Sequence, residues 1–354
     1  MILSIQYLRG LAALLVLLSH AAWKGSQYAG DPLSWFHVGA SGVDVFFVIS
    51  GFVMCHTTRN KHGQPFDVAR FLGHRFSRII PLYWSLSTFA LLVFLVAPGM
   101  VNSGGGHTDI LKSYLLIPTE DKYLIQAGWT LSYELFFYGI FAIGLFMPRA
   151  AGHVLTCMVL FGLFALGRVM EAERGPATDA LVAFATDAIL VNFIYGIALY
   201  HLYQRKTLPK RWVWLVLLVA AAWIVAVNQE WLPKEWMLIR MRCFRYGVPA
   251  FLLCWGLSGL EDELKRVPSR LASYIGDASY SIYLVHPFAL ALAAVVLKKI
   301  GLASSGALFV CIITVAAVCA GFVCYELIEK PLLRYFRPKI DGLFDRAETR
   351  LKRA

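Results

Sequence analysis

Four ionisable residues stand inside long apolar stretches of this sequence, where such groups are costly and mostly line functional cavities. They are His20 in LLSHAAW, Asp44 in GVDVFF, Glu134 in LSYELF and His286 in YLVHPF. A histidine beside a carboxylate has its tautomer fixed and its basicity raised, as a general base requires. We therefore expect His20, held by Asp44 or Glu134, to act as a base. The alternative is that the His20 ring only joins helices through hydrogen bonds.

Two pairs of arginines accompany these residues. Arg75 and Arg78 in RFSRIIPLYW are three residues apart, so they share one face of a helix. Paired guanidinium groups at a membrane surface bind phosphate well, which indicates either an anionic lipid or a phosphorylated cofactor. Arg242 and Arg245 begin another apolar stretch. We expect them to bind substrate or, as the alternative, to form structural ion pairs with the two acidic residues.

The composition places these residues in a membrane protein. The chain has 354 residues, of which 58% are hydrophobic and only 16% are charged, and its mean hydropathy is +0.62. These values exclude a soluble domain. The net charge of +11 does not indicate a nucleic-acid partner, because the basic residues punctuate apolar runs instead of forming a stripe. The seven cysteines show no paired spacing, so we expect neither a disulfide framework nor a metal site.

Apolar windows long enough to cross a bilayer predict an all-α polytopic membrane protein with about ten transmembrane helices. The windows are 8–23, 38–56, 79–97, 129–147, 154–170, 181–203, 212–228, 241–260, 274–297 and 305–327. If both termini are cytoplasmic, 22 Lys and Arg residues fall in inner segments and nine in outer segments. This bias predicts the orientation, because inner loops of membrane proteins carry the excess of positive charge.

The predicted orientation assigns a depth to each intramembrane charge. His20 follows Arg9 by eleven residues, which is roughly 16 Å along a helix and near the middle of the bilayer. The same calculation places five residues of four other predicted helices in the outer half of the membrane: Asp44, Glu134, Arg242, Arg245 and His286. So many charged groups at similar depth indicate a hydrated polar chamber. A chamber of this kind also suits a proton-coupled transporter or flippase, although we find no internal repeat.

Two segments outside the windows carry further expectations. Residues 98–128 are expected to form a loop over the outer mouth, marked by Gly104-Gly105-Gly106. Residues 338–354 are expected to form a basic cytoplasmic tail after a membrane domain over residues 1–337. The segment after Pro331 has an amphipathic pattern, which indicates either a helix on the inner leaflet or a solvated charged tail.

Six motifs follow one another along the chain: SIQYLRGLAALLVLLSHA, GASGVDVFFVISGFVM, RFSRIIPLYW, WTLSYELFFY, GDASYSIYLVHPF and ELIEKPLLRYF. Together they resemble the acyltransferase-3 family of membrane O-acyltransferases, especially its exopolysaccharide-acetylating branch. They cover nearly all of residues 1–337 in the family's order. By position, the resemblance implies that His20 is the essential histidine and that Asp44 and Glu134 are the motif acids. It also implies that Arg75 and Arg78 are the arginine pair that grips the donor.

The resemblance implies transfer of an acyl group, commonly acetyl from acetyl-coenzyme A, to a hydroxyl of a carbohydrate or lipid-linked saccharide. It also implies a multi-pass protein of the bacterial cytoplasmic membrane. The pantetheine arm would thread between helices toward His20, which would remove the acceptor proton; an acyl-imidazole intermediate is the variant. No metal is required.

We expect the acceptor to enter from the outer side, where Trp129, Arg242, Arg245 and His286 would bind it. For Trp129 an interfacial aromatic belt is the alternative. Two functions compete with that of an acyltransferase: a transporter, and a non-catalytic scaffold in polysaccharide export. The sequence leaves open the acceptor, the acyl chain length and the oligomeric state, including a homo-oligomer.

Overall fold

The computed structural model describes residues 2–36, 38–101, 105–174, 179–232, 241–302 and 306–351. In these ranges the regular structure is helical, apart from one isolated β-bridge between Thr108 and Lys122. The helices form two compact units, one made of Met1–Val53 and Ala188–Cys324 and the other of Met54–Asp187 and Tyr325–Ala354. The all-α fold expected from the sequence is confirmed.

Eight helical segments among the described residues are long and apolar enough to cross a membrane. The two remaining windows, 129–147 and 241–260, overlap the helices α6 (Gly128–Leu145) and α11 (Val248–Gly259). A count of about ten spans and the cytoplasmic location of both termini stay predictions. Several residues that entered the sequence argument lie outside the described residues: Gly104, two basic residues counted for the outer segments (Lys234 and Arg240), and the last three residues of the expected tail (352–354).

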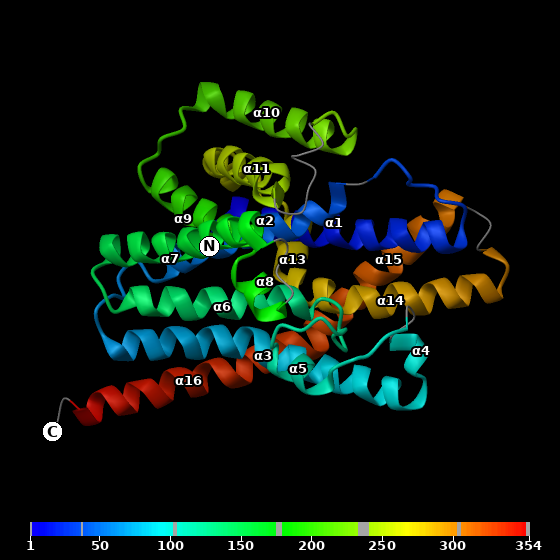
Figure 1. Cartoon of the computed structure of the whole chain (residues 1–354), viewed down its shortest axis with the longest axis horizontal. Helices are drawn as coiled ribbons and strands as arrows, with labels where there is room; N and C mark the ends of the chain where they lie inside the picture. Colours follow the sequence, from blue (N-terminus) through cyan, green and yellow to red (C-terminus); the bar gives the residue numbers. More distant parts are fainter. Residues whose placement is uncertain are drawn as a thin grey trace. The chain divides into compact units, whose positions relative to one another are not determined.

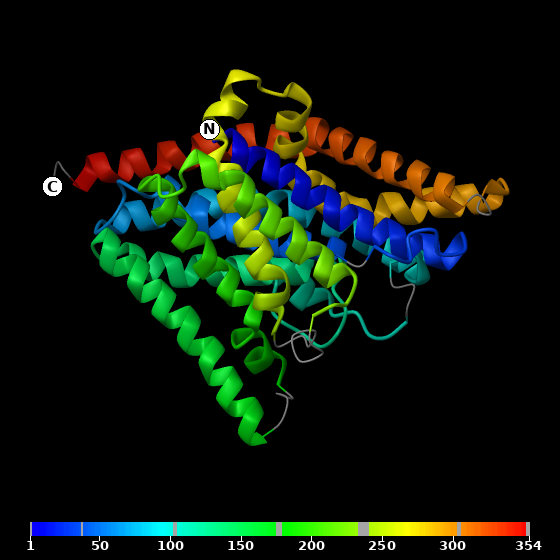
Figure 2. The same ribbon diagram turned by 90° about the horizontal axis from the view of Figure 1, so that it is seen from above.

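The first unit is organised around α1 (Leu3–Tyr28), which packs against α13 (Arg270–Asp277), α14 (Ser279–Lys299) and α15 (Gly306–Cys324). The helices α14 and α15 run side by side (Figures 1 and 2). The glycine Gly276 allows α13 to approach α1 closely, because a Cβ at this position would stand 2.2 Å from the Gln6 carbonyl oxygen. Small residues at helix contacts are typical of membrane bundles.

The start of α1 is capped by a residue from another helix. The N-cap residue Ile2 offers no side-chain cap, but Glu261 at the start of α12 (Glu261–Arg266) accepts hydrogen bonds from the backbone N–H groups of Leu3 (3.0 Å) and Ser4 (2.9 Å). The Ser4 hydroxyl also donates to it, at 2.8 Å. Burial acts to raise the pKa of Glu261, but these donors, together with Lys265, hold the pKa below its usual value. The carboxylate therefore satisfies orphan donors at the helix start.

A second close contact in this unit joins α2 (Gly42–Thr57), which follows the short turn η1 (Val38–Ser41), to α9 (Val191–Gln204). A Cβ at Gly51 would stand 2.3 Å from the Phe193 carbonyl oxygen, and one at Gly196 would stand 2.2 Å from the Val48 carbonyl oxygen. The turn η2 (Ala188–Leu190) leads into α9. This contact fixes how α2 and α9 face each other, and both helices contribute to a polar cluster described below.

The helix α10 (Lys210–Asn228) packs along α11 and keeps half of its large apolar side chains exposed, as a lipid-facing helix does. A π-helical turn, η5 (Cys243–Gly247), precedes α11. Such turns are often found at functional sites.

The second unit contains α3 (Pro65–Val96), α6, α7 (Arg149–Arg174) and α16 (Lys330–Leu351), which follows the π-helical turn η7 (Tyr325–Glu329). The sequence predicted a transmembrane window over residues 79–97. In the structure α3 begins at Pro65, so Pro81 lies inside the helix. The physical reason is that the earlier, amphipathic part of α3 finds a partner in α16.

The helix α16 packs along α3 through polar contacts. The His74 Nε2 atom lies 2.9 Å from Asp341 Oδ1, and Arg70 pairs with Asp345. The expected boundary between residues 337 and 338 falls inside this continuous helix. The segment is helical and α3 covers part of its surface. Both the helix on the inner leaflet and the solvated tail stay predictions.

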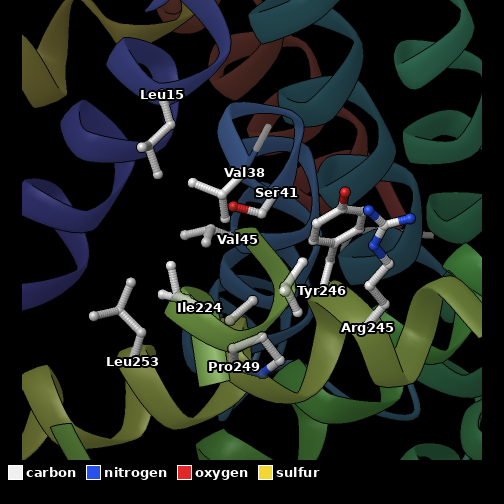
Figure 3. A pocket seen from close by; sticks show the side chains of 11 residues that line it. Leu15, Val38, Ser41, Val45, Ile224, Arg245, Tyr246, Pro249 and Leu253 are labelled. Carbon is white, nitrogen blue, oxygen red and sulfur yellow. The ribbon is translucent and has the colours of Figure 1, made fainter. Parts of the chain in front are cut away.

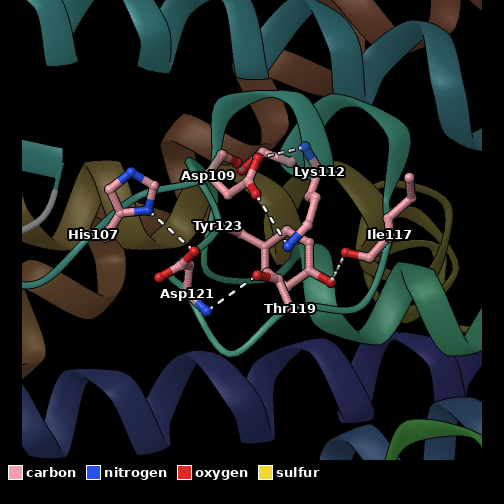
Figure 4. Close-up of polar contacts among 8 residues, drawn as sticks. His107, Asp109, Lys112, Ile117, Thr119, Asp121 and Tyr123 are labelled. Atoms are coloured by element: carbon pink, nitrogen blue, oxygen red, sulfur yellow. Dashed lines mark hydrogen bonds and ion pairs between the residues drawn. The ribbon is translucent and has the colours of Figure 1, made fainter. Parts of the chain in front are cut away.

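The described part of segment 98–128, which leaves out residues 102–104, is more than a plain loop. It contains α4 (Pro98–Val101) and α5 (Ile110–Leu115), with Asp109 capping α5 by accepting from the Lys112 N–H at 2.9 Å. Figure 4 shows the surrounding contacts, in which His107 Nδ1 lies 3.1 Å from Asp121 Oδ2. The Tyr123 hydroxyl donates to the Ile117 carbonyl at 2.8 Å. The short helix α8 (Ala180–Ala185) completes the unit.

Candidate functional site

His20 and His286 meet inside the first unit. His20 lies on α1 and is partly buried, whereas His286 lies on α14 with only 1% of its surface exposed. The His286 Nε2 atom is 3.3 Å from His20 Nδ1, and the ring centroids are 4.9 Å apart. The His20 Nδ1 atom also lies 2.9 Å from the Val16 carbonyl oxygen. The sequence placed both residues deep in the membrane, and the structure makes them neighbours.

Asp44 stands in a separate buried cluster of the same unit. Its carboxylate has no exposed surface and accepts two hydrogen bonds from Arg242, from Nε at 3.1 Å and from Nη2 at 2.8 Å. The Asn192 side-chain N–H donates to it at 2.7 Å. A buried carboxylate needs such partners, because an uncompensated charge in an apolar interior costs several kcal/mol.

The expected pair of His20 and Asp44 is not formed among the described residues. Arg242 donates hydrogen bonds to both Asp44 oxygens, and Asn192 donates to one of them. These donors, and not the His20 imidazole, are the partners of the carboxylate. The structure instead contains the alternative given above for Asp44, an ion pair with Arg242.

The second unit holds a cluster around Arg75. Glu134 and Tyr138 lie four residues apart on α6, and the Tyr138 hydroxyl donates to Glu134 Oε1 at 2.5 Å. Arg75 on α3 interacts electrostatically with both, and Tyr138 is within its hydrogen-bonding reach. The Arg75 Nε atom has no hydrogen-bond partner among the described residues. Arg78 lies one turn further along α3 and adds positive charge to the same cluster.

Arg245 borders an apolar pocket in the first unit. Figure 3 shows Arg245 and Tyr246 at one side of this pocket and Leu15, Val45 and Leu253 among its other lining side chains. The Arg245 guanidinium carbon stands 4.8 Å from the centroid of the Tyr246 ring, which favours a cation–π contact. The pocket therefore combines an apolar wall with one cationic edge.

Trp129 belongs to an aromatic cluster of the second unit. Its ring meets the Tyr133 ring edge-on at 6.1 Å, and Tyr133 stacks on Phe184 at 4.2 Å. The Tyr133 hydroxyl donates to Asp187 Oδ2 at 3.2 Å. Trp129 is partly exposed.

The sequence analysis gave no contact or site role to three polar residues that the structure places at helix contacts. Asn192 interrupts the apolar run AILVNFIYGIAL, and a lone amide in a membrane helix signals a buried hydrogen bond. Tyr138 follows Glu134 by one helical turn, a spacing that brings side chains together. Arg9 donates to the Ser279 hydroxyl at 3.0 Å and so joins α1 to α14.

The part of the chain that the structure describes contains no cluster of metal-ligating side chains. No group of three or more His, Cys, Asp or Glu residues there could hold a metal ion. What the clusters offer is an imidazole pair in one unit and a guanidinium cluster in the other.

Comparison with known proteins gives consistent matches over the length of the chain. A family model described as an acyltransferase domain matches residues 2–326. The exopolysaccharide production protein ExoZ of Rhizobium meliloti (strain 1021) is 30% identical over 338 residues, which cover 91% of this chain and 96% of that protein. The acyltransferase MdmB of Streptomyces mycarofaciens is 25% identical over 375 residues, covering 94% of this chain and 91% of MdmB. No solved structure matches the chain.

Proposed function

This chain belongs to the acyltransferase-3 family and is a multi-pass membrane enzyme that transfers acyl groups, and from this premise we propose that it acetylates a carbohydrate. The donor is acetyl-coenzyme A, and the acceptor is a hydroxyl of an extracytoplasmic or lipid-linked saccharide. A relative named for exopolysaccharide production supports this acceptor class. The enzyme works in the bacterial cytoplasmic membrane. The family favours an enzyme over the competing transporter, flippase or scaffold.

His20 is the general base of this reaction. The observation that carries the proposal is the 2.9 Å contact between His20 Nδ1 and the Val16 carbonyl oxygen. A carbonyl oxygen only accepts, so Nδ1 carries the proton and Nε2 has the free lone pair. Nε2 takes the proton of the acceptor hydroxyl while the hydroxyl oxygen attacks the thioester carbon. Direct transfer is the main route, and an acyl-imidazole on Nε2 is the variant.

Arg75 and Arg78 bind the phosphates of coenzyme A. Guanidinium groups form charge-assisted, often bidentate, hydrogen bonds with phosphate. The Arg75 Nε donor is buried and has no hydrogen-bond partner among the described residues, which supports this role. Glu134 and Tyr138 hold the Arg75 side chain in place, so Glu134 acts through the donor site.

The acceptor is bound by aromatic and cationic side chains. Trp129 offers an amphipathic ring of the kind that packs on sugar faces, and Arg245 stands at the edge of the apolar pocket. Arg242 keeps 21% of its side chain exposed beside Asp44, so it is partly available to a substrate group.

The test uses purified protein in detergent, acetyl-coenzyme A labelled in the acetyl group, and a chemically deacetylated bacterial exopolysaccharide. Label recovered in the polysaccharide as a base-labile ester, with one free thiol released per ester, supports the proposal. Consumption of acetyl-coenzyme A without a labelled saccharide would show a different acceptor. Saccharide movement across vesicles without thioester consumption would support the transporter or flippase.

A further inference from the structure

One arrangement of the ring protons of His20 and His286 is consistent with all the hydrogen-bond contacts of the two rings. The His20 Nδ1 atom is 2.9 Å from the Val16 carbonyl oxygen, and the His286 Nδ1 atom is 3.3 Å from the Ile282 carbonyl oxygen. Each carbonyl can only accept, so both Nδ1 atoms carry hydrogen. The His286 Nε2 atom then has no proton, and its lone pair faces the His20 Nδ1–H across 3.3 Å.

The local sequence of α14 favours this state of His286. Pro287 follows it and has no backbone N–H, which removes the helical hydrogen bond to the Tyr283 carbonyl. The Tyr283 backbone, like that of Ile282, interacts with the His286 ring. Ile282 is itself held by close packing against Gly321 of α15. Two carbonyl groups on the same turn therefore keep the His286 proton on Nδ1.

We propose that His286 is a positioning residue for the base His20, in the place that a carboxylate occupies in other base dyads. This inference rests on the proposed role of His20. Asp44 is committed to Arg242 and Asn192, so no acid of this cluster competes for the His20 Nδ1–H. A neutral imidazole suits this position, because His286 is fully enclosed and a charge there would be costly.

The role in the reaction can be written step by step. The acceptor O–H bond breaks as its proton moves to His20 Nε2, and the oxygen forms a bond to the acetyl carbon. His20 is then a cation, and its Nδ1–H is shared between the Val16 carbonyl and His286 Nε2. The carbon–sulfur bond breaks, and the coenzyme A sulfur takes the proton back from Nε2. The products are the ester and the free thiol, and His286 never gains or loses a proton.

Nuclear magnetic resonance of the protein labelled with nitrogen-15 histidine tests the proton arrangement directly. The chain has nine histidines, and the signals of His20 and His286 are assigned by their loss in His20→Gln and His286→Gln. The expected spectrum of the unmodified protein shows protonated Nδ1 and unprotonated Nε2 for both rings. A His20 ring protonated on Nε2 would overturn the proposal without any activity measurement.

Kinetics test the consequence, with labelled acetyl-coenzyme A and deacetylated exopolysaccharide as the substrates. His286→Leu removes the acceptor and should lower kcat by about 10- to 100-fold, a part of what a general base contributes, while the KM for acetyl-coenzyme A stays the same. His286→Gln keeps an oxygen that can accept from Nδ1 and should recover most of kcat. The matched control is His153→Leu, another buried histidine, which should keep the kcat of the unmodified enzyme.

The outcomes separate this proposal from the proposed function. If His20→Gln is inactive and His286→Leu keeps full kcat, His286 only packs and this inference fails alone. If His20→Gln keeps full transfer, the assignment of the base fails. Equal losses of kcat in His286→Leu and His286→Gln, with both variants folded, would also contradict the positioning role.

Discussion

Asp44 Oδ2 lies 2.8 Å from Arg242 Nη2, and this ion pair joins α2 to the turn before α11 around a carboxylate that has no exposed surface. Asn192 on α9 donates to the same carboxylate. Three segments distant in the sequence are therefore tied at one buried point. The first role that we assign to Asp44 is to hold this part of the first unit together.

Breaking the pair should leave an uncompensated buried charge. We expect Asp44→Asn and Arg242→Met each to lower the free energy of unfolding by about 3–5 kcal/mol. The double variant should lose less than the sum, because both partners are then removed together. Denaturant unfolding of the four proteins in detergent measures the coupling. Additive losses would show that the two side chains do not interact.

The cap at the start of α1 should make stability depend on pH. The pKa of Glu261 is lowered in the folded protein, so its contribution is complete above the ordinary glutamate pKa of about 4.5 and is lost as the pH falls through the folded value. Glu261→Gln keeps one acceptor oxygen but loses the charge. We expect its melting temperature to lie below that of the unmodified protein at pH 7, and the gap to close as the pH falls below about 4.5 and through the folded pKa of Glu261. A gap that is constant with pH would contradict the assignment.

The guanidinium groups of α3 should govern donor affinity. We expect Arg75→Gln and Arg78→Gln to weaken coenzyme A binding by about 10- to 100-fold, since charged hydrogen bonds are worth about 1.5–3 kcal/mol. Calorimetric titration with coenzyme A measures this without an acceptor. Arg149→Gln removes an exposed arginine of the same unit and should bind normally. An unchanged affinity in both α3 variants would show that these arginines do not bind the phosphates of coenzyme A.

Much of the fold was accessible from the sequence, because hydropathy alone locates apolar helices. His20 and His286 were also recognisable as candidate site residues, because an imidazole inside an apolar membrane helix is costly and is mostly functional. Their contact was not, because the face that each helix turns toward its neighbours is decided by packing. Gly276 and Gly321 set that packing by removing a side chain where α1, α13, α14 and α15 approach.

The partner of Asp44 shows the same limit. The sequence offered His20 and the arginines as partners, and depth along a span did not distinguish between them. Arg242 is the N-cap residue of the π-helical turn η5, and hydropathy contains no signal for such a turn. Asn192, by contrast, could have been noticed as a lone amide in an apolar run.

The assignment of His20 as the base is tested most directly by acetyl transfer in His20→Ala, with coenzyme A affinity and melting temperature measured on the same preparation. We expect kcat to fall by about 10²- to 10⁴-fold, while binding of coenzyme A and thermal stability stay close to those of the unmodified protein. A His20→Ala enzyme that transfers acetyl at the full rate would contradict the account.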